Sequence, residues 1–161
     1  MDIIPFMPRE ESHRAELVTD EAGLQAAFEV RKRVFVEEQG VPPDLELDGH
    51  DAAADHVVVE VAGKVVATGR LLLEDGEARI GRIAVLPEWR RRGIAGEIIT
   101  ALERQATQRG AIEVMLHAQT HAQGLYDKLG YIVSGNGFVE AGIDHVLMIK
   151  RLSQDSKQGR L

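Results

Sequence analysis

The sequence predicts one domain with a mixed α/β fold, and three observations lead to that prediction. The chain has 161 residues, which fits one domain with a substantial core. Its residues are 44% hydrophobic and 28% charged, as in ordinary globular proteins. Strand-like apolar runs alternate with segments of helical spacing, without a repeat or linker. We therefore expect one domain over 1–161, with loose termini at 1–12 and 152–161.

The predicted elements follow in the order strand, helix, three strands, helix, strand, helix, strand. A cap at Thr19 or Asp20 opens the first helix, and Gly40 with Pro42-Pro43 ends it. The dipeptides at 63–64 and 75–76 are hairpin signals, and Gly110 ends the second helix. The expected strands are 16–19, 56–61, 65–73, 78–86, 112–118 and 145–150, the second and third helices are 93–108 and 122–129, and 42–55 is an acidic loop.

The helix over 93–108 connects strands 78–86 and 112–118, which predicts that these strands are parallel neighbours. Ligand sites in such sheets lie at the carboxyl ends of the strands, where the following helix begins. Residues 87–96 occupy that position, so the sequence predicts a binding site there.

Composition narrows the functional class. The chain has no cysteine, which removes disulfides, thiolate metal sites and an enzyme-bound thioester. The apolar run at the N-terminus is too short for a signal peptide, and no stretch reaches the ~20 apolar residues of a membrane span. We therefore expect a cytoplasmic protein without a membrane partner. A net charge of −7 disfavours nucleic acid and favours a cationic substrate.

The stretch PEWRRRGIAGEII at 87–99 concentrates cations at the start of a helix. A helix N-terminus offers free N–H groups and partial positive charge, and Gly93 and Gly96 leave room for a phosphate. The spacing matches neither a P-loop nor the dinucleotide fingerprint. From these residues alone, an anion site and a solvated basic turn are both open.

The same residues resemble the GNAT N-acetyltransferase superfamily. RRRGIA fits its acyl-CoA signature as Arg90-x-x-Gly93-x-Ala95. The segment AQGLYDKLGYIV at 122–133 is similar to the family's helix after the next strand, and 30–56 and 137–150 resemble a small bacterial branch. The resemblance implies a mostly antiparallel sheet splayed between strands 78–86 and 112–118, with helices on both faces.

The resemblance also implies acetyl-CoA as cosubstrate. Its pyrophosphate would lie on the N–H groups of Arg91 to Gly96, and its pantetheine would pair with the main chain of the preceding strand. The implied cofactor-binding residues are Ile83, Ala84, Val85, Arg90, Arg91, Arg92, Gly93, Ile94, Ala95, Gly96, Gln119 and Tyr126.

For the chemistry, Tyr126 matches the family position that protonates the departing thiolate, since a phenol with a pKa of ~10 stays protonated at neutral pH. The alternative is a packing role with Leu125 and Leu129. Tyr131 is expected in the core.

The general base is open between carboxylates and histidines. Glu38 and Glu46, with Glu37 and Asp48 beside them, lie in the segment expected over the acceptor, although a solvated acidic loop would contain the same residues. The other candidates are His117, which closes a strand, and His145, which begins one; both residues have a structural role as the alternative.

The functional prediction is direct acetyl transfer from acetyl-CoA to a primary amine of a small molecule or peptide. The alternatives are a non-catalytic CoA-binding module and a nucleic-acid binder, the latter disfavoured because one arginine triplet lacks interleaved aromatics. No metal is expected, because His117 and His121 span a strand end and a loop. A homodimer is the default oligomer.

Overall fold

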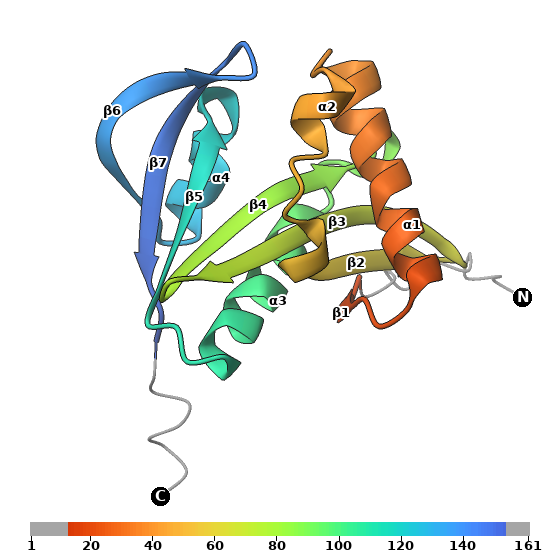
Figure 1. The fold of residues 1–161 in the computed structure, drawn as a ribbon, viewed down its shortest axis with the longest axis horizontal. Coiled ribbons are helices and arrows are strands. Elements are labelled where there is room, and N and C mark those ends of the chain that lie inside the picture. Colours follow the sequence, from red (N-terminus) through yellow and green to blue (C-terminus); the bar gives the residue numbers. More distant parts are fainter. Residues whose placement is uncertain (1–12, 154–161) are drawn as a thin grey trace, which may run out of the picture.

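The structure is a computed structural model that describes residues 13–153. Seven strands form one sheet in the order β1-β2-β3-β4-β5-β7-β6 (Figure 1). The expected loose terminus at 1–12 and most of the expected tail lie outside the described residues. The strands are β1 (Ala15–Leu17), β2 (Asp55–Val61), β3 (Lys64–Glu74), β4 (Glu77–Val85), β5 (Glu113–Gln119), β6 (Ile132–Glu140) and β7 (Ile143–Arg151).

All neighbouring strands are antiparallel except β4 and β5, which are parallel. Their pairing covers only Ala78–Ile80 of β4 against Val114–Leu116 of β5. Beyond that short ladder the two strands diverge toward their carboxyl ends, as Figure 1 shows. The predicted mixed, mostly antiparallel sheet splayed between two parallel strands is confirmed.

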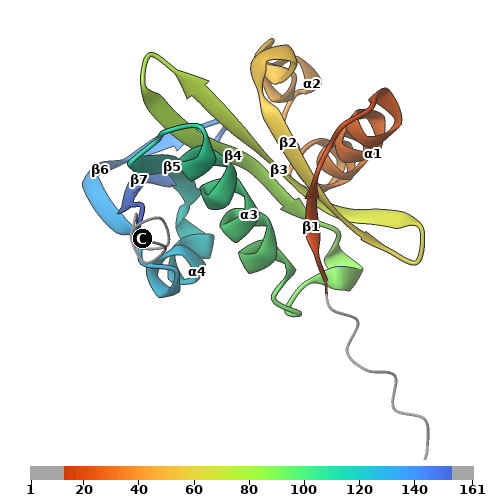
Figure 2. The same ribbon diagram turned by 90° about the horizontal axis from the view of Figure 1, so that it is seen from below.

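Helices cover both faces of the sheet (Figure 2). α1 (Glu21–Arg31) continues into a π-helix, η1 (Lys32–Glu38), and lies with α2 (Pro43–Glu46) on one face. α3 (Ile94–Gln108) and α4 (Gln123–Lys128) lie on the other. None of the helices within residues 13–153 is both long and apolar enough to cross a membrane. Three short 3₁₀ turns complete the elements: η2 (Asp51–Ala53), η3 (Pro87–Trp89) and η4 (Thr120–Ala122).

The core forms because α3 places its apolar side chains on one stripe against the sheet. Ile94, Ile98 and Leu102 repeat at intervals of four residues, the spacing that keeps side chains on one helix face. Each is at most 1% exposed. A Cβ at Gly69 of β3 would lie 2.6 Å from Cγ2 of Ile98. The missing side chain therefore lets α3 approach the sheet closely.

A β-bulge bends β4 at the start of the splay. Arg70 of β3 pairs with Gly81, but Thr68 pairs with Ala84, so two β4 residues face one residue of β3. Arg82 lies in the bulge with φ of 54°, a left-handed conformation that is strained for a side chain of this size. Bulges bend a strand and increase its twist, which is the geometry that turns β4 away from β5.

Three segments differ from the sequence prediction. β6 was not predicted, because Gly135 and Gly137 interrupt its apolar pattern and most of its residues are exposed at the sheet edge. The expected loop 42–55 contains α2 and η2. Leu152, expected in the loose tail, is buried, and its N–H donates to the Ile112 carbonyl at 2.8 Å.

Candidate active site

A cleft of about 1020 Å³ opens where β4 and β5 diverge. One wall comes from β3, β4 and the α2 segment, and the other from β5, α4 and the β6–β7 hairpin. The N-terminus of α3 closes one end, with Arg91, Gly93, Ala95 and Gly96 in its lining. The predicted site at 87–96 therefore faces a cavity that extends across the sheet.

The start of α3 is free to bind an anion. Its N-cap is Gly93, with φ of 79°, and no side chain caps the helix. The N–H groups of a first helical turn have no intrahelical partner. A Cβ at Gly93 or Gly96 would meet nothing within 4 Å, so both positions border open space.

The three arginines before this helix have different roles. Arg90 donates to both carboxylate oxygens of Glu38 at 2.7 Å and to the Val85 carbonyl at 3.0 Å. The Arg92 guanidinium lies 4.8 Å from the centre of the Trp89 ring and outside the cleft lining. Arg91 lines the cleft and makes no hydrogen bond to the described residues, so it is the arginine of the triplet that remains free for an anionic ligand.

The end of β4 presents an open main-chain edge to the cleft. Ala84 and Val85 pair with β3 on one side. On the other side the pairing with β5 ends at Ile80, and Ile83, Ala84 and Val85 line the cleft. A strand edge of this kind can accept an extended, amide-containing ligand as an additional strand.

Tyr126 of α4 brings a hydroxyl to the same cleft. Its side chain is 7% exposed and its ring contacts Tyr131 edge-on, with centroids 5.8 Å apart. Burial raises the pKa of Tyr126 to about 12. Among the described residues its hydroxyl makes no hydrogen bond. Tyr131 is buried as predicted, and its hydroxyl donates to Glu103 at 2.7 Å.

Gln119 connects the two walls of the cleft. Its amide exchanges two hydrogen bonds with Gln39 at the end of η1, at 3.0 and 3.1 Å. His121 Nε2 lies 2.6 Å from the Gln119 Oε1 atom. Gln39 was not predicted as a site residue, because 80 residues separate it from Gln119 and neither belongs to a motif that would reveal the contact.

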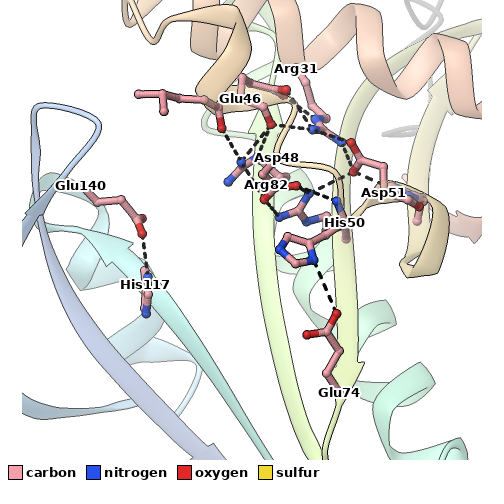
Figure 3. Close-up of polar contacts among 12 residues, drawn as sticks. Arg31, Glu46, Asp48, His50, Asp51, Glu74, Arg82, His117 and Glu140 are labelled. Atoms are coloured by element: carbon pink, nitrogen blue, oxygen red, sulfur yellow. Dashed lines mark hydrogen bonds and ion pairs between the residues drawn. The ribbon is translucent and has the colours of Figure 1, made fainter.

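Two histidines and a carboxylate gather on the β5–β6–β7 wall. His117 Nδ1 lies 3.1 Å from Oε1 of Glu140, and His145 Nε2 lies 3.8 Å from Oε2 of the same residue. Figure 3 shows Glu140 and His117 on this wall, facing the opposite one across the cleft. His145 is 6% exposed, its Nδ1 lies 2.7 Å from the Ile143 carbonyl, and its ring stacks on Phe138. Glu140 was not identified from the sequence because β6 was not predicted.

The acidic residues Glu46 and Asp48 lie on the opposite wall (Figure 3). Their carboxylates are paired with arginines, whereas we expected them from the sequence to be available to the acceptor. Both carboxylate oxygens of Glu46 accept from Arg31, at 2.5 and 2.9 Å, and Glu46 is 4% exposed. Asp48 accepts from Arg70 at 2.5 Å and from Arg82 at 3.2 Å. Burial alone would raise the pKa of Asp48, but the hydrogen bonds and charge of Arg70 outweigh it and lower that pKa.

These contacts correct two predictions about the acidic segment. Glu46 is no longer a candidate base, because a buried carboxylate with both oxygens paired to a guanidinium has no free lone pair aimed at a substrate. The hydrogen bond from Arg90 also lowers the pKa of Glu38, which makes that carboxylate a weaker base. Arginines pair with Glu38, Glu46 and Asp48, so these three carboxylates offer less negative charge to a cationic substrate than the sequence suggests.

No group of three or more histidine, aspartate or glutamate side chains within residues 13–153 is arranged to hold a metal ion. The two histidines of the HAQTH segment contact different partners: Glu140 for His117 and Gln119 for His121.

Comparison with known proteins agrees with this geometry. A family model described as the acetyltransferase (GNAT) domain matches residues 18–152. The chain belongs to the GNAT acetyltransferase family. It is 41% identical to the uncharacterized N-acetyltransferase YjcF of Bacillus subtilis over 138 residues, which cover 85% of this chain and 99% of that protein.

Solved structures of acyltransferases share the fold. An acyl-CoA N-acyltransferase from Pseudomonas aeruginosa is 26% identical with a TM-score of 0.76, covering 84% of this chain and 98% of that one. A GNAT acetyltransferase from Elizabethkingia anophelis with acetyl-CoA bound is 15% identical with a TM-score of 0.66, covering 86% and 99%. The second likeness concerns the fold alone.

Proposed function

We propose that this GNAT protein transfers an acetyl group from acetyl-CoA to a primary amine in one ternary complex. The observation that carries the proposal is the continuity of the cleft. It joins an uncapped helix N-terminus, the open edge of β4 and the Tyr126 hydroxyl in one cavity. The bound acetyl-CoA of the structural neighbour supports the choice of cosubstrate.

In this proposal, separate groups of residues bind the pyrophosphate and the pantetheine of acetyl-CoA. Arg91 and the N–H groups of Gly93 to Gly96 hold the pyrophosphate through the helix dipole and unpaired donors. The main chain of Ile83 to Val85 pairs with the pantetheine amides. Arg90 acts indirectly in this proposal: its pairing with Glu38 and with the Val85 carbonyl positions the end of β4. We give Arg92 no contact with the coenzyme, because it lies on Trp89.

Proton transfer involves the wall of the cleft that is formed by β5, α4 and the β6–β7 hairpin. Tyr126 protonates the departing thiolate, since its raised pKa keeps the phenol protonated across the physiological range. The base that takes the amine proton is a histidine of the same wall. We favour His145 over His117, because a bond from its Nδ1–H to the Ile143 carbonyl would leave Nε2 unprotonated and oriented. His117 is the second candidate, with Glu140 as its partner.

Two measurements test this proposal. Acetyl-CoA at about 100 times its Kd should raise Tm by roughly 5–10 °C, and thiol release should follow when a suitable amine is added. Gly96→Val should abolish the Tm shift, because a branched side chain would occupy the open space through which a phosphate approaches.

Thr100→Val is the matched control, since it places the same side chain on the exposed face of the same helix. Gly96 is preferable to Gly93 as a test position, because its backbone lacks the positive φ that strains any substituted residue. An unchanged Tm at saturating acetyl-CoA would refute the site. A Tm shift without thiol release from any amine would instead favour the non-catalytic CoA-binding module.

A further inference from the structure

Five arginines line the cleft. They differ in whether their guanidiniums already donate hydrogen bonds to carboxylates of the protein. Arg70, Arg82 and Arg90 donate to carboxylates of the protein. Arg79 and Arg91 line the cleft without a hydrogen bond to any described residue. Arg91 lies at the proposed pyrophosphate site. Arg79 lies near the opposite end, on β4 just before the bulge, where the coenzyme phosphates do not extend in our proposal.

We propose that Arg79 binds an oxyanion of the acceptor, so that the substrate is an amine that also carries a carboxylate or a phosphate-like group. This inference rests on the proposed acetyl transfer and names the class of its acceptor. The side chain of Arg79 is 49% exposed, and its nearest carboxylate is Glu77, at 3.7 Å, outside the cleft lining. A guanidinium in a cleft that makes no hydrogen bond to the described residues is suited to bidentate recognition of a carboxylate or phosphate.

The charges around Arg79 support an anionic ligand. Next to this wall, the guanidiniums of Arg31, Arg70 and Arg82 pair with three buried or half-buried carboxylates, whereas Arg79 has a looser ion pair with the exposed Glu77, at 3.7 Å. The three carboxylates are Glu46, Asp48 and Asp51. An oxyanion beside Arg79 would therefore compete with a single exposed ion pair, the contact with Glu77, and exposed ion pairs contribute little to stability.

A second observation concerns Arg82, the neighbouring arginine on the same strand. Burial, followed by repulsion from Arg70, lowers the pKa of Arg82. Arg70 and Arg82 are thus close enough for their positive charges to disfavour one another. The exposed side chain of His50 lines the same region.

The opposite wall has the complementary character. Glu140 lies between His117 and His145, so that this wall can attract an ammonium group and then take its proton. Figure 3 shows Glu140 and His117 on one side of the cleft and Arg82 with Asp48 on the other. A substrate with an amine at one end and an oxyanion at the other matches both walls. A diamine would place its second ammonium beside the arginines, which costs binding energy.

The test compares acceptors of equal length that differ only in the group distal to the amine: an ω-amino carboxylate, an aminoalkylphosphonate, a neutral alkylamine and a diamine. Thiol release from acetyl-CoA gives kcat/KM for each. We expect an anionic acceptor to be preferred, and Arg79→Gln to lower the ratio of anionic to neutral kcat/KM by about 10- to 100-fold. Arg79→Lys should restore part of this ratio. Arg104→Gln, an exposed arginine of α3 outside the cleft, should leave it unchanged.

Two results would overturn the anion site while leaving acetyl transfer intact. One is a diamine or neutral amine that is acetylated faster than both anionic acceptors. The other is an Arg79→Gln variant that lowers kcat/KM equally for all four. The preferred anion, carboxylate or phosphonate, identifies the oxyanion.

A binding measurement separates failure of this inference from failure of the proposed function. If none of the amines causes release of thiol from acetyl-CoA, calorimetric titration of the ω-amino carboxylate into the CoA-saturated protein still tests whether Arg79 binds an anion. Binding that Arg79→Gln weakens would support the anion site in a chain without turnover. Absence of binding, or equal binding by both proteins, would refute it.

Discussion

Replacing Tyr126 by Phe removes one hydroxyl and keeps the ring that packs on Tyr131. The structure predicts a small effect on stability, because the hydroxyl makes no hydrogen bond to the described residues and its loss leaves no protein group unpaired. We expect the free energy of unfolding at pH 8 to change by less than about 1 kcal/mol. The predicted effect on chemistry is large, since loss of a general acid typically lowers the rate about 10²- to 10⁴-fold.

The structure also predicts how the free energy of unfolding of this variant depends on pH in the alkaline range. Tyr126 has a pKa of about 12 in the fold against 10.0 without it. The folded state therefore keeps its proton while the unfolded state loses it, and stability falls as pH rises from about 10 to 12. The slope for one such group approaches about 1.4 kcal/mol per pH unit. Tyr126→Phe removes this contribution, so the variant should gain stability relative to the parent protein above pH 10.

Initial rates of thiol release and urea unfolding at pH 8 and pH 11 provide the assay. Tyr131→Phe is the matched control: it loses the bond to Glu103 and should be less stable at pH 8 but should keep its catalytic rate. A Tyr126→Phe protein with more than half of the parent kcat would refute the general-acid role. A decrease of more than about 2 kcal/mol in the free energy of unfolding at pH 8 would show that the hydroxyl stabilises the fold.

Three further predictions concern the scaffold of the site. Gly69→Ala should destabilise the protein by about 1–3 kcal/mol, because its Cβ would overlap Ile98; the urea midpoint measures this, and an unchanged midpoint would contradict the close packing of α3. Glu46→Ala should cost about 3–5 kcal/mol, since it leaves the buried Arg31 guanidinium with half of its partners; a near-neutral effect in calorimetry would contradict it. Stability should also decline below pH 4, because Arg70 holds the pKa of Asp48 below its unfolded value; Asp48→Asn should flatten this decline in acid unfolding curves.

Matched variants separate these effects from general sensitivity to mutation. Gly81→Ala introduces the same methyl group on the neighbouring strand, where nothing lies within 4 Å of its Cβ, and should be better tolerated than Gly69→Ala. Glu37→Ala removes an exposed carboxylate six positions after Arg31 and should change stability by less than about 0.5 kcal/mol.

The sequence by itself determined the elements whose signals are local. The spacing of Ile94, Ile98 and Leu102 predicted α3 and its buried face, because helical periodicity depends only on neighbouring residues. The connection through that helix predicted the parallel pair, since such crossovers have few arrangements. The resemblance carried by Arg90-x-x-Gly93-x-Ala95 and by 122–133 supplied the family, which the family model confirms, and the splayed sheet, which the strand pairing confirms.

Only the tertiary structure decided how the charged residues are used. The sequence places Arg90 beside Gly93 but cannot show that Glu38, 52 positions earlier, occupies its guanidinium. Similarly, Glu46 belongs to a solvated acidic loop in the sequence and to a buried ion pair with Arg31 in the fold. Ion pairs form between groups that the fold brings together, so charge counted along the chain does not reveal which charges remain free.

The arrangement of the acceptor side was likewise decided by long-range contacts. β6 has no clear apolar alternation and forms because it can pair with β7 at the sheet edge, which brings Glu140 to His117 and His145. The bulge at Arg82 depends on the register between β3 and β4, and no residue in the sequence specifies that register alone. The sequence therefore determined where the coenzyme site should begin. Packing between distant strands decided which side chains can contact a substrate. A side chain can do so only if no residue from elsewhere in the chain already pairs with it, and the fold determines those pairs.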